Sequence, residues 1–217
     1  RPGAPFSTND IVPIPNHLTE AGVVAVKADS PYKTIEELVA AAKEKGNLKA
    51  STNGNKASNH TAAQLLAKSA GFKYKAIPYG GTADQLLALR QGEVDFTCAK
   101  VADVAKLVKG DKPELRVLAV FNTKRDPELP NVPTLGEKGL YPEWYGSARA
   151  LVAPKGTKPE VIQYYVEAFK KTMQDPAVIE AHKKAGMALD FKDNKELGDL
   201  IKAQDKFARD VVNDLYK

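Results

Sequence analysis

The chain has 217 residues, of which 43% are hydrophobic and 27% are charged, a composition close to that of an average globular protein. The length allows one large domain or two small ones with a sizeable core. No run approaches about 18 apolar residues, so no segment is expected to span a bilayer. The single cysteine, Cys98, excludes an internal disulfide framework and a multi-thiolate metal site.

The charge balance is basic, because 32 Lys and Arg against 27 Asp and Glu give a formal net charge of +5. A basic chain can bind nucleic acid, but here the basic residues alternate with acidic ones, as in KEKGNLK at 43–49. There is no run of five like charges and no predicted helix with a basic stripe and aromatic partners. We therefore expect a mixed, solvated surface without a nucleic-acid partner. Its modest positive field would help to attract an anionic small molecule.

The first half of the chain alternates between predicted strands and helices. Residues 22–27 (GVVAVK) are an apolar run bounded by turn residues, which predicts a buried strand. Thr34 and Glu37 have the spacing of a capping box and predict the start of a helix that ends at Gly46. The pattern then predicts a strand at 48–51, a helix at 59–70, a strand at 74–77, a helix opened by a second capping box of Thr82 and Gln85, and a strand at 94–98.

The second half continues this alternation after one interruption. It contains a predicted short helix at 102–108, a strand at 116–120, an extended connector with four prolines at 122–143, a strand at 144–152 and amphipathic helices at about 158–174, 176–185 and 194–215. Strands that alternate with helices imply parallel pairing with helices on the faces of the sheet. The sequence therefore predicts an α/β fold.

Two loops are candidates for ligand binding, because ligands of open α/β sheets collect where strands end and helices begin. Both loops offer glycine, small polar side chains and the unpaired N–H groups of a helix start, which favour an anion. Ordinary capped turns would have the same composition, so both interpretations stay open at this stage. The residues expected to bind are Ser51, Thr52, Asn53, Gly54, Ser58, Asn59 and His60 in the first loop, and Tyr79, Gly80, Gly81 and Thr82 in the second.

The sequence gives weak support for an enzyme. TNGNKAS at 52–58 is not a phosphate-binding P-loop, and neither G-x-G-x-x-G nor G-x-S-x-G occurs. The three histidines are far apart and lack a metal-binding spacing, while Ser58 and His60 are poorly spaced for a nucleophile and its base. Cys98 ends an apolar strand and is expected to be a buried, inert thiol. We therefore expect a protein without catalytic residues, metal or cofactor.

Several runs together resemble a known family. These are SPYKTIEELVAAAKEKGNLKASTNGNKASNHTAAQLL, IPYGGTADQLLALRQGEVDF, RVLAVFNTKRDPELPNVPTLGEKGL, VAPKGTKPEVIQYY and DPAVIEAHKKAGMALDF. The spacing in Pro78-Tyr79-x-Gly81, in Gly92-x-Val94-Asp95 and in the segment from Arg125 to Thr134 is specific. The chain resembles the substrate-binding proteins of tripartite tricarboxylate transporters, also called the Bug family, over roughly residues 20–217.

The resemblance implies a fold of the periplasmic binding protein type II class, with two α/β lobes that close over a small organic acid. On this plan residues 1–21 are an N-terminal remnant or connector, 22–143 form lobe two, and 144–217 return to lobe one. It also implies a periplasmic protein that delivers a mono-, di- or tricarboxylate to membrane transporter subunits without chemistry on the ligand. A carboxylate sensor that reports to a signalling partner and an enzyme acting on an organic acid are the alternatives.

Three features bear on how the family pattern applies here. Where relatives often have Asp after the strand that follows Gly92-x-Val94-Asp95, this chain has Lys100, which is expected to pair with a second carboxylate of the ligand. Arg149, on the returning strand, is a candidate charged supplement, with a structural salt bridge as its alternative role. The family's opening segment has no counterpart, and Arg1-Pro-Gly-Ala lacks the pattern of a signal peptide. We therefore expect lobe one to be incomplete in this chain, either because the chain is a truncated product or because the partial lobe is completed in another way.

Overall fold

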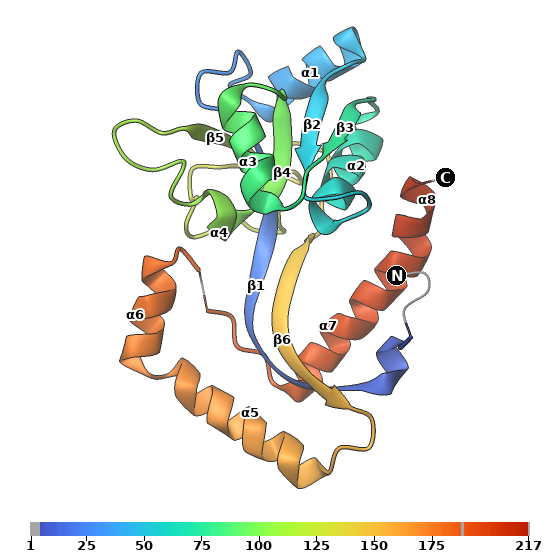
Figure 1. The fold of residues 1–217 in the computed structure, drawn as a ribbon, viewed down its shortest axis with the longest axis vertical. Helices are drawn as coiled ribbons and strands as arrows, with labels where there is room; N and C mark the ends of the chain where they lie inside the picture. Colours follow the sequence, from blue (N-terminus) through green and yellow to red (C-terminus); the bar gives the residue numbers. More distant parts are fainter. Residues whose placement is uncertain (1–4, 188, 217) are drawn as a thin grey trace. The chain divides into compact units, whose positions relative to one another are not determined.

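A computed structural model describes residues 5–187 and 189–216 (Figure 1). It separates into two compact units. Unit 1 contains the residues up to Thr19 and those from Ala148 onward, and unit 2 is Glu20–Ser147. Strands β1 (Ile11–Lys27) and β6 (Gly146–Pro154) pair with each other, and each contributes residues to both units.

Unit 2 is built on a sheet with the strand order β3-β2-β4-β1-β5. Strand β2 (Lys49–Thr52) runs parallel to both β3 (Lys75–Pro78) and β4 (Phe96–Lys100). Strand β1 runs antiparallel to both β4 and β5 (Leu115–Phe121), so the prediction of parallel pairing is wrong for β1. The reason is the place of helix α1 (Ile35–Lys45), which lies at the end of the sheet where β1 finishes (Figure 1). The chain therefore enters β2 from that end and runs back.

The starts of two helices test the predicted capping boxes. Thr34 caps α1 by accepting a hydrogen bond from the Glu37 N–H, as predicted, although the Glu37 carboxylate accepts from Lys33 N–H instead of from the cap. The second capping box is wrong. Helix α3 (Thr82–Gln91) has Gly81 at its N-cap, and Gln85 is fully buried. Gln85 is drawn away from the cap because the core offers it several hydrogen-bond partners.

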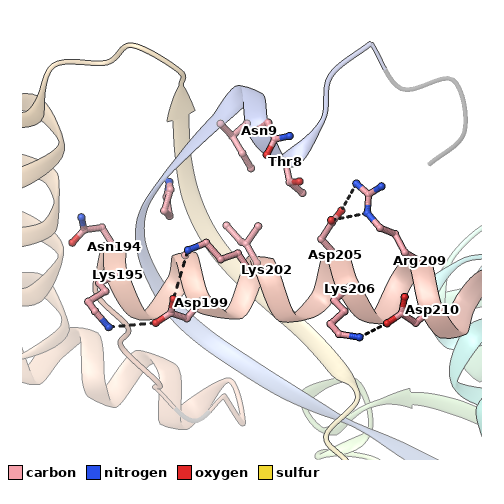
Figure 2. Close-up of a pocket in the computed structure, with 14 residues that line it drawn as sticks. Thr8, Asn9, Asn194, Lys195, Asp199, Lys202, Asp205, Lys206, Arg209 and Asp210 are labelled. Carbon is pink, nitrogen blue, oxygen red and sulfur yellow. Dashed lines mark hydrogen bonds and ion pairs between the residues drawn. The ribbon is translucent and has the colours of Figure 1, made fainter.

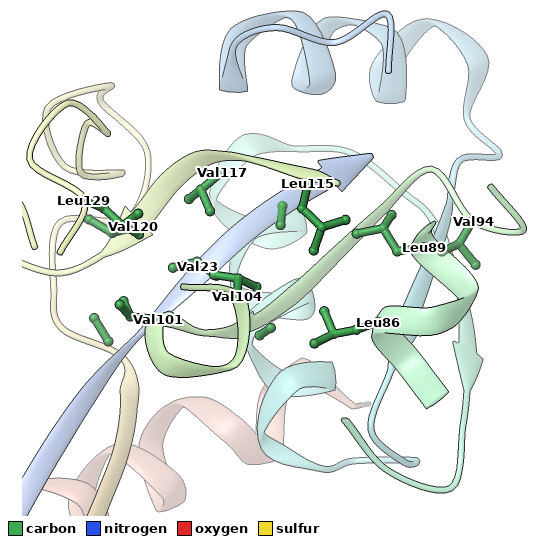
Figure 3. Packing of buried hydrophobic residues seen from close by; sticks show 13 residues of the cluster. Val23, Leu86, Leu89, Val94, Val101, Val104, Leu115, Val117, Val120 and Leu129 are labelled. Atoms are coloured by element: carbon green, nitrogen blue, oxygen red, sulfur yellow. The ribbon is translucent and has the colours of Figure 1, made fainter. Parts of the chain in front are cut away.

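In unit 2, apolar side chains are buried on both faces of the sheet. On one face Val23 and Ala25 pack with Leu86 and Leu89 of α3 and with Val104 of the short helix α4 (Val101–Val104) (Figure 3). The alternate residues of β1, Val24 and Val26, point to the other face and are also fully buried. Helix α2 (Ser58–Ala70) packs against β2 and β4. Burial on two faces explains why the strands read as continuous apolar runs in the sequence.

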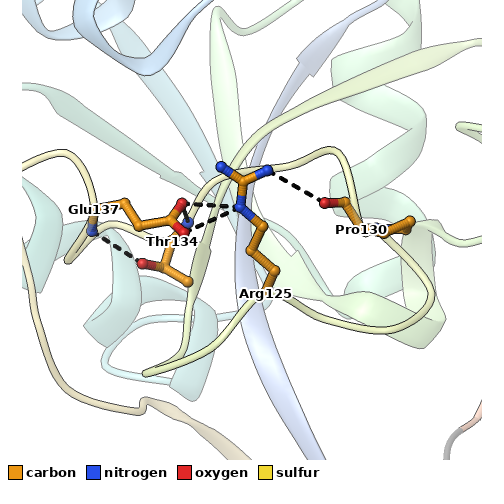
Figure 4. A network of polar contacts seen from close by, with 4 residues as sticks. All are labelled: Arg125, Pro130, Thr134 and Glu137. Atoms are coloured by element: carbon orange, nitrogen blue, oxygen red, sulfur yellow. Dashed lines mark hydrogen bonds and ion pairs between the residues drawn. The ribbon is translucent and has the colours of Figure 1, made fainter.

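The proline-rich connector at 122–143 is held in place by polar contacts (Figure 4). Arg125 Nε donates to the Glu137 carboxylate at 3.0 Å, and Arg125 Nη1 donates to the Pro130 carbonyl at 3.4 Å. Glu137 also accepts from Thr134 N–H at 3.1 Å. Beyond these contacts, Val120 N–H donates to Pro133 O, and Leu135 N–H donates to Val120 O. The connector thus lies along β5 instead of forming a free loop.

Unit 1 surrounds the first half of β1 and most of β6. Ile14, Ala153, Ile162 and Val166 form its small core. Its elements are the 3₁₀ turn η1 (Thr8–Asp10), α5 (Pro159–Met173), α6 (Pro176–Lys184), α7 (Asn194–Phe207), the π-helical turn η2 (Ala208–Val212) and α8 (Asn213–Leu215). Among the described residues, no helix combines the length and apolar character needed to cross a membrane.

Two predicted boundaries in unit 1 differ from the structure. The strand predicted at 22–27 begins at Ile11, inside the range 1–21 that was expected to be a connector. Pro13 and Pro15 argue against a strand at this position in the sequence, because proline lacks the N–H that a strand interior normally donates. The helix predicted at 194–215 is regular only to Phe207 and then widens into the π-helical turn.

We expect Gln85→Ala to lower the free energy of unfolding by about 2–4 kcal/mol, because buried polar groups of α2 and β4 would each lose a partner. Urea denaturation measures this change. Gln91→Ala, at the exposed end of the same helix, is the matched control and should change the free energy by less than about 0.5 kcal/mol. Equal stability of the two variants would contradict the structural role given to Gln85.

Candidate ligand-binding site

The two predicted loops begin side by side in unit 2. Strands β3, β2 and β4 are adjacent and parallel, so their carboxyl ends meet at one edge of the sheet. Thr52 pairs with Pro78 at that edge, and Tyr79 N–H donates to Thr52 O at 2.9 Å. Lys100 ends β4 at the same edge. The structure therefore brings together the two loops and Lys100, which lie far apart in the sequence.

The N-cap residues of the helices that follow these loops do not cap them with a side chain. The N-caps of α2 and α3 are Ala57 and Gly81, and neither makes a side-chain cap hydrogen bond. By contrast, Thr34, Asp175 and Asp193 cap α1, α6 and α7. In α2 the Asn53 side chain, from the preceding loop, accepts the Asn59 N–H instead. The positive end of each helix dipole favours an anion at this edge.

The first two residues of the first loop have buried side chains that form hydrogen bonds within unit 2. Ser51 is fully buried, and its hydroxyl lies 3.0 Å from both Gln85 O and Thr97 Oγ1. Thr52 is also fully buried and donates to Gly54 O at 3.3 Å. These two residues shape the loop from within, while later residues of the loop are more exposed.

The middle of the first loop turns sharply into α2. Gly54 has φ +125, a conformation that other residues rarely adopt. Asn53 Oδ1 accepts from Asn59 N–H at 3.2 Å, which orders the start of the helix. Ser58, the first residue of α2, is half-buried, and its carbonyl accepts from the Tyr145 hydroxyl at 3.1 Å.

His60 lies in the first turn of α2 and is buried. Its Nδ1 accepts the Lys56 N–H at 3.0 Å, an arrangement that requires Nδ1 to be unprotonated. Burial, and next the charge of Lys56, lower the pKa of His60 below 6.5. The imidazole is therefore neutral at neutral pH and carries its proton on Nε2.

The second loop leads into α3 through two adjacent glycine residues. Gly80 is exposed, and Gly81 has an extended backbone, with no atom within 4 Å of the point that a Cβ would occupy. Thr82 is half-buried. The Tyr79 hydroxyl donates to Glu93 Oε2 at 3.0 Å, and burial, followed by this contact, raises the pKa of Tyr79. Asp84 places a carboxylate in the first turn of α3, where it interacts favourably with the positive end of the helix dipole.

Lys100 is a buried charged group at this edge, with only 4% of its surface exposed. Its Nζ donates to Asn59 Oδ1 at 2.7 Å and lies 3.5 Å from Ser58 Oγ. Burial lowers the pKa of Lys100, while the nearby Asp103, Cys98 and Glu20 raise it by less. The ammonium is therefore held mainly by neutral oxygen atoms.

Sequence reasoning missed three residues that organise this edge. Gln85 donates to Cys98 O and Thr97 Oγ1 and accepts from Asn59 Nδ2, although its spacing indicated a cap. Glu20 is 4% exposed and lay in the presumed connector. Tyr145 gave no sequence signal beyond its place at the start of a predicted strand.

Arg149 is the predicted site residue that lies in unit 1. It is exposed and acts electrostatically on His17. The His17 and His182 rings are 5.6 Å apart in an edge-on arrangement. Burial first, then His182 and Arg149, lower the pKa of His17.

Unit 1 also contains a groove of about 660 Å³ that the sequence did not predict (Figure 2). It lies between the segment 8–13 and α7. Its charged side chains form pairs along the helix, with Arg209 Nε 2.8 Å from Asp205 and Lys195 3.4 Å from Asp199. None of the residues predicted to bind ligand lines it.

The fold and this edge place the chain in the class of α/β proteins with a periplasmic-binding-protein-like architecture. The family model described as the tripartite tricarboxylate transporter family receptor (TctC) matches residues 2–215. The chain belongs to this family, as the resemblance predicted.

Two curated relatives support the assignment. A UPF0065 protein encoded in the gbd 5′ region of Cupriavidus necator is 38% identical over 154 residues, which are 70% of this chain and 46% of the relative. A UPF0065 protein from the tcbD-tcbE intergenic region of Pseudomonas sp. (strain P51) is 31% identical over 210 residues, which are 94% of this chain and 61% of the relative. The chain thus spans about half to three-fifths of these proteins.

Solved structures show the same fold. A TctC solute-binding protein from Polaromonas has a TM-score of 0.83 at 26% identity, over 97% of this chain and 72% of that one. MatC from Rhodopseudomonas palustris, solved with bound malate, has a TM-score of 0.78 at 22% identity, over 96% of this chain and 71% of that one. Another R. palustris protein, solved with adipate, has a TM-score of 0.80 at 21% identity, over 92% and 68%.

Protonation of His60 should destabilise the fold. The unfolded chain binds a proton near the ordinary pKa of about 6.5, whereas folded His60 resists it, so stability is retained above about pH 6.5 and falls as the pH drops from there through the lowered folded pKa. We expect the stability lost between pH 7.5 and 5 to be smaller in His60→Gln than in the wild type, as measured by urea denaturation. Identical losses in the two proteins would contradict the destabilising effect of His60 protonation. His17→Gln provides the same test for His17, whose pKa is also lowered.

Proposed function

We propose that the chain belongs to a periplasmic solute-binding protein that captures a small organic carboxylate at the edge formed by β3, β2 and β4. The observation that carries this proposal is the pair of helix starts, after Ala57 and Gly81, that follow adjacent parallel strands and whose N-cap residues provide no side-chain cap. Two helix N-termini at the same edge of the sheet favour the binding of an anion in unit 2.

The physical basis is hydrogen bonding from neutral donors. Backbone N–H groups and small hydroxyls stabilise a carboxylate without a dedicated arginine, since two or three such donors suffice to favour the charged form. Ser58, the backbone around Gly81 and Thr82 are partly accessible donors at this edge. The neutral His60 adds a further N–H donor, Nε2, at the start of α2.

The family supports a role in transport. Relatives of the same fold bind dicarboxylates, namely malate in MatC and adipate in a second R. palustris protein. The family's description as a transporter receptor supports delivery of the ligand to tripartite tricarboxylate-type membrane subunits, without chemistry on the ligand.

Binding is tested by a thermal-shift screen with acetate, malate, adipate and citrate. A ligand that binds only the folded state should stabilise the protein by about 2.7 kcal/mol at a hundredfold excess over its Kd. We expect at least one of these acids to raise the unfolding temperature, and their neutral methyl esters to leave it unchanged. A screen in which no carboxylate stabilises the chain would contradict the proposal.

The site itself is tested by Gly81→Val, which we expect to abolish this stabilisation while the unliganded protein unfolds as before. The extended backbone of Gly81 accepts any residue, and no neighbouring atom obstructs the new side chain. Gly54→Val should also remove binding, but its φ of +125 makes it less stable, so Gly81 gives the cleaner result. Ala181→Val, on the exposed surface of α6, is the control of equal size. Unchanged calorimetric affinity in Gly81→Val would place the ligand elsewhere.

A further inference from the structure

Lys100 places a buried ammonium at the start of α2. Its Nζ contacts Asn59 Oδ1 and Ser58 Oγ, and these are the first two residues of that helix. The N-terminal end of a helix carries partial positive charge and favours anions. A cation held there is therefore in an unfavourable position unless a negative group accompanies it.

The groups around Lys100 do not fully supply that negative charge. Its hydrogen-bond acceptors at α2 are neutral, and with only 4% of its surface exposed it has lost most of its water. Glu20 on β1, Asp103 on α4 and Cys98 on β4 all favour the charged form. Burial outweighs them, since the pKa of Lys100 remains below its ordinary value.

We propose that Lys100 is a specificity-determining residue of this site, whose ammonium binds an anionic group of the ligand directly beside the start of α2. This inference rests on the proposed function and deepens it by naming the residue that selects for charge. The ligand anion supplies the countercharge that Asn59 and Ser58 lack, and it interacts with the helix start at the same time.

The inference predicts that ligand binding is coupled to the proton on Lys100. A bound anion raises the pKa of Lys100, so the protein takes up protons on binding once the pH exceeds the pKa of the unliganded state. Affinity should therefore fall as the pH rises from 7 toward 10. His60 titrates below this range and Cys98 at about 12, so neither of them produces the effect.

The test is calorimetry with malate and adipate as probes, at pH 7 to 10, on the wild type and three variants. Lys100→Gln keeps an N–H donor for Asn59 but removes the charge, and Lys100→Arg keeps the charge. Lys106→Gln removes an exposed charge from the segment that follows β4. Because hydrogen bonds to charged groups contribute about 1.5–3 kcal/mol, we expect Lys100→Gln to weaken binding by roughly 10- to 100-fold at pH 7. Lys106→Gln should retain the wild-type affinity, and Lys100→Arg should bind more tightly than Lys100→Gln.

The pH profile provides a readout that a purely structural role would not change. The wild type should lose affinity and take up protons as the pH rises, and Lys100→Gln should show neither effect. Wild-type affinity that is independent of pH, or equal affinity in Lys100→Gln and the wild type, would overturn the inference while the proposed function stands. A wild type that binds neither these probes nor any acid of the thermal-shift screen would overturn both. The wild-type pH profile requires no substitution, so it tests the inference even if one of the variants does not fold.

Discussion

The hydrogen bonds of Gln85 hold together the elements from which the candidate site is made. From α3, its side chain reaches Asn59 on α2 and the Cys98 carbonyl on β4, while its own carbonyl accepts from Ser51 on β2. One buried residue therefore fixes the starts of two helices against the ends of two strands. A buried network of this kind is stable only when each member has its partners, which makes the geometry of this edge rigid.

This rigidity supports the proposal that the site binds an anion without a dedicated arginine. The N–H groups at a helix start are effective only if they are already oriented, because reorienting them on binding would consume part of the affinity. Asn59 has a double role, since its amide nitrogen donates to Gln85 and its amide oxygen accepts from Lys100. The structural network and the charge at the site are thus connected through a single side chain.

Much of this edge could be predicted from the sequence, since apolar runs and glycine turns marked the strands, helices and both loops. The directions of individual side chains could not be predicted. Gln85 matched a capping box, but a local pattern gives no information on partners from other strands that compete for the same amide. Ser51 similarly read as a loop hydroxyl, although its partners Gln85 and Thr97 become neighbours only in the folded sheet. The missed part of β1 has a different cause. Pro13 and Pro15 contradict a strand locally, and the extended conformation is supported there by pairing with β6 and by the bridge between Asn16 and Lys192, which are remote in the sequence.

Binding of an anion at the starts of α2 and α3 is tested most directly by backbone amide NMR during titration with malate. We predict that the largest shifts fall on the amides of residues 53–60 and 80–84, with smaller shifts along the rest of unit 2. Saturable binding that shifts amides beside the groove between 8–13 and α7, and leaves those two loops unchanged, would show that the anion binds elsewhere.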